Sequence, residues 1–297
     1  MAGATVQGQD TPQRRTLTAQ DAMDLGLHRM GGRPTFRRYL GDLWARREFI
    51  WLIPRSEMRS RAMNTFLGSI WHLLNPLLLA GVYYLVFGVL LGTGERGGIE
   101  NYSAYLVIGI LVFFFTQKSF VGGARTVVND VRLLQNVNFP AAVLPISSTL
   151  AEALTHMWAL GAMFVVVALT GETPTLWWLL VIPLAMIQLV MNLGLAFISS
   201  RITVHFRDAE QLLPYLTRIW LYLSGVMFGV ERIHDPVKRM IFQANPPYAF
   251  IHATRELIFE GRIAWAFVGI AAAWAVGIFV IGFVFFWRHE GEYANAA

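Results

Sequence analysis

MRSRAMNTFLGSIWHLLNPLLLAGVYYLVFGVLLG, residues 58–92, is the stretch that decides the fold class of this chain. It carries no Asp, Glu, Lys or Arg from Ala62 onward, and three arginines (Arg55, Arg59 and Arg61) lie on its N-terminal side. Because a helix rises about 1.5 Å per residue, the apolar run is long enough to cross roughly 30 Å of hydrocarbon. Basic residues tend to stay on the cytoplasmic side, so the pattern predicts a first membrane span that starts in the cytosol.

The composition of the whole chain also indicates an integral membrane protein. Of its 297 residues, 55% are hydrophobic and only 14% are charged, whereas soluble domains carry about 25% charged residues. Most of the basic residues behind the net charge of +5 lie before the first span or at the ends of apolar runs. This distribution favours positive-inside anchoring and argues against a nucleic-acid partner. The absence of cysteine excludes disulfides and thiolate metal sites.

The residues before the first span form two segments. Positions 1–33 are polar without apolar periodicity, which predicts a disordered cytosolic tail. Positions 34–54 place apolar residues such as Phe36, Tyr39 and Leu43 at helical spacing opposite a charged face, and Pro54 is expected to end this helix. The pattern predicts an amphipathic interfacial helix on the cytoplasmic leaflet; a soluble helix packed on a cytosolic core is the alternative.

Five further apolar runs follow the first span. Together they predict an all-α integral membrane fold of six transmembrane helices at positions 55–290, with a short cytosolic tail at 291–297 and both termini in the cytosol. The predicted second to sixth spans are approximately 102–122, 141–169, 177–200, 212–230 and 263–287.

Three of the connections between spans carry patterns of their own. The cytoplasmic segment 124–138 begins as a short amphipathic helix, of a kind suited to dock on a soluble partner, and breaks near Pro140. The loop 201–208 returns to the cytosol. The external segment 231–262 holds two short apolar-periodic stretches around Asn245 and Pro246, which predicts re-entrant half-helices.

Ionisable residues inside predicted spans are functional candidates by default. Glu152 and His156 in the third span are four residues apart, so they share one helix face, and Arg218 lies in the fifth span. An ion pathway and a pair that simply satisfies its own hydrogen bonds are both open.

The chain lacks the motifs of an enzyme. A P-loop needs Lys directly after Gly, but Lys118 follows Gln117 and Lys238 follows Val237. The HExxH, Cys/His zinc and GxSxG patterns are also missing. The sequence therefore predicts a membrane pore or carrier with no cofactor of its own, whose energy comes from elsewhere.

In their order along residues 36–290, these motifs resemble the Wzm-type permeases of type-2 ABC polysaccharide exporters, which serve O-antigen, teichoic acid and galactan. The entrance signature of that family has a Leu-Gly, a Trp and a Pro spaced like Leu67-Gly68, Trp71 and Pro76. NDVRLLQNVNFPAAVLP, residues 129–145, resembles its first coupling segment, and the loop at 207–208 and the external segment 245–255 also match. The arginine-rich style and long N-terminus look most like the galactan exporter permease of mycobacterial-type envelopes.

This resemblance implies a homodimer in the plasma (inner) membrane with two copies of a separate Wzt-type subunit, which would bind ATP and Mg. It implies a polyprenyl-diphosphate-linked glycan as cargo, moving from the cytosol to the outer side among the membrane lipids. The segments 36–53, 125–138 and 201–210 would couple to the ATPase; the candidate residues are Trp44, Arg47, Arg125, Asn129, Asp130, Leu133, Asn136, Arg207 and Asp208. Asn245, Pro246 and Arg255 would belong to a periplasmic gate.

A channel at the dimer interface is expected to start at the first and fifth spans. Arg55, Arg59 and Arg61 at its entrance could attract the diphosphate, since guanidinium groups match phosphate oxygens; plain anchoring is the alternative. Aromatic residues on the spans could stack on sugar faces or could pack against lipid and neighbouring helices. These residues are Tyr83, Tyr84, Phe113, Phe114, Tyr215, Trp220 and Tyr222.

Three other functions stay open at this point. A proton-coupled secondary transporter would use Glu152, His156 and Arg218 and would need no ATPase, although no inverted repeat of broken helices supports it. A type-2 ABC permease for a drug or small lipid would share the architecture. A membrane scaffold without transport activity would leave the coupling segments without a role.

Overall fold

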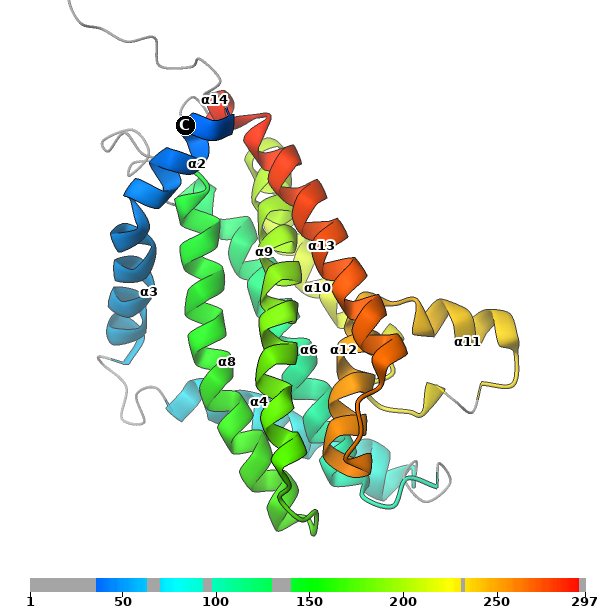
Figure 1. Ribbon diagram of the computed structural model, residues 1–297. Helices are drawn as coiled ribbons and strands as arrows, with labels where there is room; N and C mark the ends of the chain where they lie inside the picture. Colours follow the sequence, from blue (N-terminus) through cyan, green and yellow to red (C-terminus); the bar gives the residue numbers. More distant parts are fainter. Residues whose placement is uncertain (1–35, 63–69, 93–97, 130–139, 231–232, 294–297) are drawn as a thin grey trace, which may run out of the picture. The chain divides into compact units, whose positions relative to one another are not determined.

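The computed structural model describes residues 36–62, 70–92, 98–129, 140–230 and 233–293, and all regular secondary structure in these ranges is helical (Figure 1). Four helical segments among them are long and apolar enough to cross a membrane. They are α6 (Tyr102–Asn129), α8 (Val143–Leu169), the segment Leu176–His205 and α13 (Trp265–Trp287). These four coincide with the predicted second, third, fourth and sixth spans.

The predicted first and fifth spans correspond to shorter helices. α4 (Ile70–Tyr83) continues into the π-helical stretch η1 (Tyr84–Leu90), and α10 (Ala209–Leu223) has only 15 residues. The six-span count therefore stays a prediction. The remaining helical elements are α2 (Phe36–Ala45), α3 (Arg47–Ala62), η2 (Leu176–Leu180), α9 (Val181–His205), α11 (Pro236–Gln243), α12 (Pro246–Arg255), η4 (Glu256–Glu260) and α14 (Glu290–Tyr293).

Two helix boundaries differ from the sequence prediction. The helix predicted at 34–54 is divided at Arg46 into α2 and α3, and α3 continues through Pro54, which was expected to end it. A proline removes a single backbone hydrogen bond, and the residues after it are mostly good helix formers, so the helix resumes. The amphipathic turn predicted to begin at residue 124 is the end of α6, which runs without a break to Asn129.

The long helices pack through small residues where they cross. α9 lies against both α13 and α6 (Figure 1). A Cβ atom added to Gly194 of α9 would lie 2.5 Å from the Ile278 carbonyl of α13, and one added to Gly282 would overlap the Gly194 carbonyl. Since helices in lipid gain little from hydrophobic burial against each other, such close backbone contact is a main source of their association.

Interhelical hydrogen bonds converge on α6. The Gln188 amide of α9 donates to the Val112 carbonyl and to the Thr116 hydroxyl, each at 2.9 Å. On another face of α6, Gln117 donates to the Thr217 hydroxyl of α10 at 2.9 Å. Buried side-chain amides of this kind hold transmembrane helices in register, because an unsatisfied polar group in hydrocarbon is costly.

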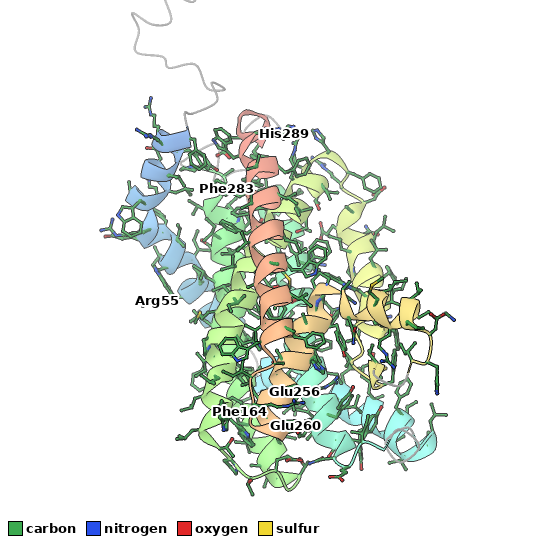
Figure 2. All side chains as sticks on the ribbon, turned by 45° about the vertical axis from the view of Figure 1, so that its right-hand side comes forward. Arg55, Phe164, Glu256, Glu260, Phe283 and His289 are labelled. Atoms are coloured by element: carbon green, nitrogen blue, oxygen red, sulfur yellow. The ribbon has the colours of Figure 1, made fainter. Side chains whose placement is uncertain are left out.

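The two ends of α13 define the two ends of the helical bundle (Figure 2). His289 and Phe283 lie at one end, which we call the His289 end; Glu256 and Glu260 lie at the other, the Glu260 end, together with Phe164 of α8. The turn after α8, at Gly171, belongs to the Glu260 end, where Asn101 before α6 donates to the Thr170 carbonyl at 3.1 Å.

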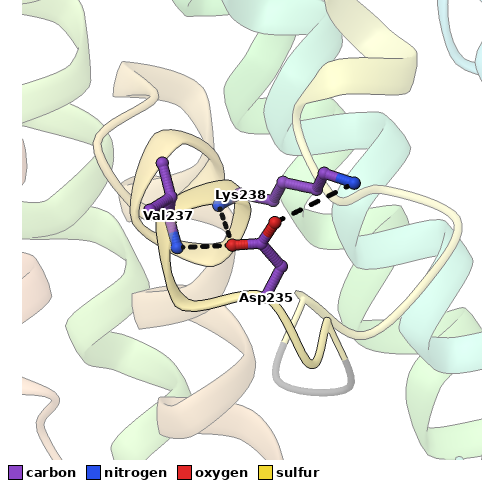
Figure 3. A network of polar contacts seen from close by, with 3 residues as sticks. All are labelled: Asp235, Val237 and Lys238. Carbon is purple, nitrogen blue, oxygen red and sulfur yellow. Dashed lines mark hydrogen bonds and ion pairs between the residues drawn. The ribbon is translucent and has the colours of Figure 1, made fainter.

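Two short helices, α11 and α12, stand where the re-entrant half-helices were predicted. The Asp235 carboxylate caps α11 by accepting hydrogen bonds from the backbone N–H groups of Val237 at 2.9 Å and Lys238 at 3.4 Å (Figure 3). α12 begins at Pro246, and its residues 247–251 and 253–255 are buried where the helix packs on α6 and α13. Non-helical breaks at membrane depth are tolerated only where protein covers them in this way.

Candidate functional site

An ion pair joins two of the segments that carry candidate coupling residues. Arg125 at the end of α6 places its Nε 3.1 Å from Oε1 of Glu210 in the first turn of α10. Arg207 and Asp208 are exposed in the loop just before that turn, and Asn129 is exposed at the end of α6. Asp130, Leu133 and Asn136 lie outside the described residues. The structure thus brings the predicted first and second coupling segments into contact.

The interfacial segment presents an exposed aromatic residue with a cation over it. Trp44 of α2 is 73% exposed, and the Arg47 guanidinium lies 5.6 Å from its ring centroid. Arg47 also donates a hydrogen bond to the Trp44 carbonyl at 3.3 Å. A tryptophan held in this way offers a large contact area with a polar edge, which suits either a headgroup region or a partner protein.

The entrance signature is described only in part. Leu67 and Gly68 lie outside the described residues, and the side chains of Arg59, Arg61 and Pro76 are outside the described set as well. Trp71 is 40% exposed on α4.

The candidate channel aromatics fall into a buried group and an exposed group. Phe113 is fully buried and meets Trp220 of α10 edge to face, with ring centroids 6.1 Å apart, and Phe114 is half-buried. Tyr84 on η1 and Tyr215 and Tyr222 on α10 are exposed. Tyr222 and Arg218 of α10 lie near enough to Tyr83 to act on it electrostatically. The exposed candidate aromatics therefore lie on α10 and on η1.

Asn245 and Arg255, the candidates for the periplasmic gate, connect neighbouring helices through hydrogen bonds. The Asn245 amide donates to the Leu223 carbonyl at 2.8 Å, and its oxygen accepts from the Trp220 indole at 2.8 Å, so it fastens the end of α10 to α12, whose first residue is Pro246. The buried Arg255 guanidinium donates to the carbonyls of Gly225, Val226 and Tyr105, each at 2.9 Å.

Arg255 has further contacts that fix its position. Its guanidinium carbon lies 3.2 Å from the centroid of the Tyr105 ring. Gly109 on α6 makes room for it, because a Cβ there would come within 2.6 Å of Arg255 Nη2. Gly225 has φ +62°, a backbone conformation that favours glycine. The turn after α10, α6 and α12 are thus held together by one planar cation.

The intramembrane ionisable pair lines a small pocket between α6 and α8. Glu152 and His156 of α8 and Lys118 of α6 are among its lining residues. The buried His156 ring stacks on Phe115 with centroids 4.4 Å apart and planes within 9°. The pocket thus brings Lys118 together with the pair that sequence reasoning found. The sequence showed only Glu152 and His156, because these two share one helix and Lys118 comes from another.

Sequence reasoning missed a polar contact at the His289 end. The Glu290 carboxylate in α14 accepts hydrogen bonds from the Tyr39 hydroxyl at 2.7 Å and from the Ala141 backbone N–H at 2.6 Å. Burial raises the pKa of Glu290 to about 7, while both hydrogen bonds act in the opposite direction. The pKa of Tyr39 is raised well above its usual value by burial and by the Glu290 charge.

An aromatic contact continues this arrangement. Tyr293 stacks on Phe286 at 4.4 Å and donates to the Phe286 carbonyl at 3.0 Å, while the Arg201 guanidinium of α9 lies 5.7 Å from the Tyr293 ring. Tyr39 and Glu290 are 251 positions apart in the chain, so no local pattern in the sequence could have revealed their contact.

Comparison with known proteins identifies the family. Residues 48–259 match the model of the family described as ABC-2 type transporter. The chain is 29% identical over 263 residues to an O-antigen export system permease protein RfbA of Myxococcus xanthus, covering 87% of this chain and 99% of that protein. It is 24% identical over 245 residues to a protein of the same name from Klebsiella pneumoniae, covering 82% and 93%.

These matches confirm the resemblance to Wzm-type permeases that the motifs indicated. Members of the family are the membrane subunits of transporters and not enzymes, in agreement with the absence of catalytic motifs. The family match also removes the support for a proton-coupled secondary transporter built on the intramembrane pair. The chain therefore belongs to the ABC-2 type transporter family, as a multi-pass membrane permease.

Proposed function

We propose that this chain is the membrane half of an ATP-driven exporter that moves a polyprenyl-diphosphate-linked glycan from the cytosol to the outer side of the inner membrane. The observation that carries this proposal is the match of residues 48–259 to the ABC-2 family, together with relatives named as O-antigen export permeases. An O-antigen-like glycan or a galactan is the proposed cargo. The chain has no P-loop lysine, so ATP and Mg would bind to a separate Wzt-type subunit.

Two copies of the permease and two of the ATPase form the proposed assembly. α10 exposes a continuous stripe of large apolar residues, which a soluble surface would not tolerate and which a second copy or lipid would cover. The stripe consists of Leu212, Tyr215, Leu216, Ile219, Tyr222 and Leu223. Twofold symmetry is the commonest arrangement for such assemblies and would place the α10 surfaces of two copies on either side of a channel.

The proposed mechanism starts at the His289 end. Closure of the ATPase subunits would push the coupling residues around Arg125 and Arg207. These two groups would move together, because the ion pair between Arg125 and Glu210 joins their segments. Tilting of α6 and α10 would then be passed through Asn245 and Arg255 to α12, because these residues fasten α12 to both helices. The exposed tyrosines on α10 offer faces on which sugars could stack during passage.

The experiment is a transport assay in inverted membrane vesicles that contain the permease and its ATPase subunit. A radiolabelled polyprenyl-diphosphate-linked glycan is added outside, and its protection from a glycosidase is followed after ATP addition. The matched control replaces the P-loop lysine of the ATPase subunit by alanine.

ATP-dependent protection that the control abolishes would support the proposal. Protection without ATP, or none at all, would contradict it. ATP-driven movement of a fluorescent phospholipid in place of the glycan would support the drug or small-lipid permease.

A further inference from the structure

We propose that the C-terminal turn formed by Glu290 and Tyr293 is a positioning element that links all three coupling segments and transmits movement among them. The proposal rests on the proposed function, since it assigns these residues to the coupling of ATP hydrolysis to export. Nothing in the family resemblance assigned a role to residues 290–293.

Glu290 connects two of the segments through a single carboxylate. One oxygen accepts from Tyr39, which lies in the interfacial helix α2. The other accepts from the backbone N–H of Ala141, which lies in the stretch 129–145 that resembles the first coupling segment. At 2.7 and 2.6 Å both hydrogen bonds are short, and when the Glu290 carboxyl group is ionised they are charge-assisted and about twice as strong as neutral ones.

Tyr293 connects the remaining segment, the second coupling segment at 201–210. Its ring stacks on Phe286 of α13, and the Arg201 guanidinium lies 5.7 Å from the ring centroid. Arg201 is the first residue of the second coupling segment, is buried, and lies 2.9 Å from the His205 ring nitrogen one turn further along. Glu290 and Tyr293 are three residues apart and belong to the same helical turn.

This arrangement makes a mechanical prediction. A displacement of α2 or of the residue after Pro140 must pull on Glu290, and a displacement of the α9 end must push on Tyr293. Because the last span α13 carries both residues on its C-terminal end, the turn ties the coupling segments to a long helix of the bundle. Loss of the Glu290 contacts should therefore uncouple hydrolysis from export rather than abolish either the fold or the ATPase.

The test compares export per ATP hydrolysed in proteoliposomes that contain the permease with its ATPase subunit. Glu290→Ala is expected to lower this ratio about tenfold, the effect of losing one to two partly buried hydrogen bonds to a carboxyl group, while ATPase binding is retained. Glu290→Gln should recover most of the ratio, because its amide oxygen still accepts one of the two bonds. Glu260→Gln, an exposed carboxylate at the opposite end, is the matched control and should match wild type.

Several outcomes would overturn the inference. A wild-type ratio in Glu290→Ala would do so, as would a Glu290→Gln ratio as low as that of alanine. If the alanine variant is not inserted, Tyr39→Phe, which removes one hydroxyl, takes its place, and a wild-type ratio in that variant would contradict the proposal. Wild-type protein that shows no ATP-driven export would refute the proposed function instead, so the two failures are distinguishable.

Discussion

At the scale of single residues, the side chain of Arg255 is held by several contacts at once. Its planar guanidinium donates to three backbone carbonyls in two separate parts of the chain and lies over the Tyr105 ring. A lysine ammonium carries the same charge but lacks the flat fork of donors that can address these carbonyls together. Shape, and not charge alone, therefore determines which residue this position accepts.

We expect Arg255→Lys to lower the free energy of unfolding by roughly 2–3 kcal/mol, because buried carbonyls lose charged donors. Arg262→Lys is the matched control: its ion pair with Glu256 is largely exposed on the arginine side, and such pairs contribute about 1 kcal/mol or less. Thermal unfolding followed by tryptophan fluorescence in detergent gives the comparison. Equal melting temperatures for the two variants would contradict this role of Arg255.

Glu290 gives a second prediction at this scale, one of pH dependence. Its folded-state pKa of about 7 lies above the ordinary 4.5, so between these values the folded state binds more protons than the unfolded state. Stability should therefore fall as the pH rises from 4.5 through 7, by about 1–3 kcal/mol in total. Tyr39 and Tyr293, with Arg201 behind Tyr293, are the titratable and charged groups that face this site among the described residues.

Melting temperatures measured from pH 5 to pH 8 test this expectation. The wild-type value should decline over the range, and Glu290→Gln, which cannot ionise, should show a shallower decline. Identical pH slopes for the two proteins would mean that Glu290 does not titrate in this window.

At the scale of helices, the closest approach is the crossing of α9 and α13. Gly282→Ala places a methyl group into the Gly194 backbone, and overpacking of this kind costs about 1–3 kcal/mol. Gly277→Ala on the same helix meets nothing within 4 Å and should be neutral or slightly stabilising, since alanine favours helix. Melting temperatures of the two variants decide the matter, and a Gly277→Ala variant that melts as low as Gly282→Ala would show that the crossing is not the cause.

The helical elements also show how far the sequence predicts this fold. Long uncharged runs identified the four long helices, because hydrophobic length is a local property that the bilayer requires. The fifth run was harder: after residue 209 the chain forms three short helices, α10, α11 and α12, before it reaches Glu256 at the Glu260 end. The periodicity of apolar residues could not predict this path, because the path depends on the hydrogen bonds of Asn245 and Arg255 to other helices.

The candidate site was predictable only where its residues are neighbours in the sequence. The spacing of Glu152 and His156 was visible in the chain, but the addition of Lys118 to their pocket required the packing of α6 on α8. The contact between Arg125 and Glu210 and the contact between Tyr39 and Glu290 are likewise products of tertiary structure. Residue type alone could not show that Tyr215 is exposed and Phe113 is buried.

At the scale of the whole molecule, the proposed six-span topology can be tested with single cysteines, because the chain contains none of its own. Thr173 in the turn after α8 and Arg288 after α13 are both exposed. With three crossings between them, Thr173→Cys should react with a membrane-impermeant maleimide in intact cells, and Arg288→Cys only after permeabilisation. Reaction of both on the same side would mean that α10 and α12 do not complete a crossing.

The most direct single measurement is purification of the tagged permease from its native membranes in mild detergent, followed by an ATPase assay of the complex. We expect a P-loop subunit to co-purify in a one-to-one ratio, and its hydrolysis to change when the permease carries Arg125→Glu and to recover when Glu210→Arg is added, since the pair joins two coupling segments. A permease that purifies alone and without ATPase activity would contradict the assignment to an ATP-driven exporter.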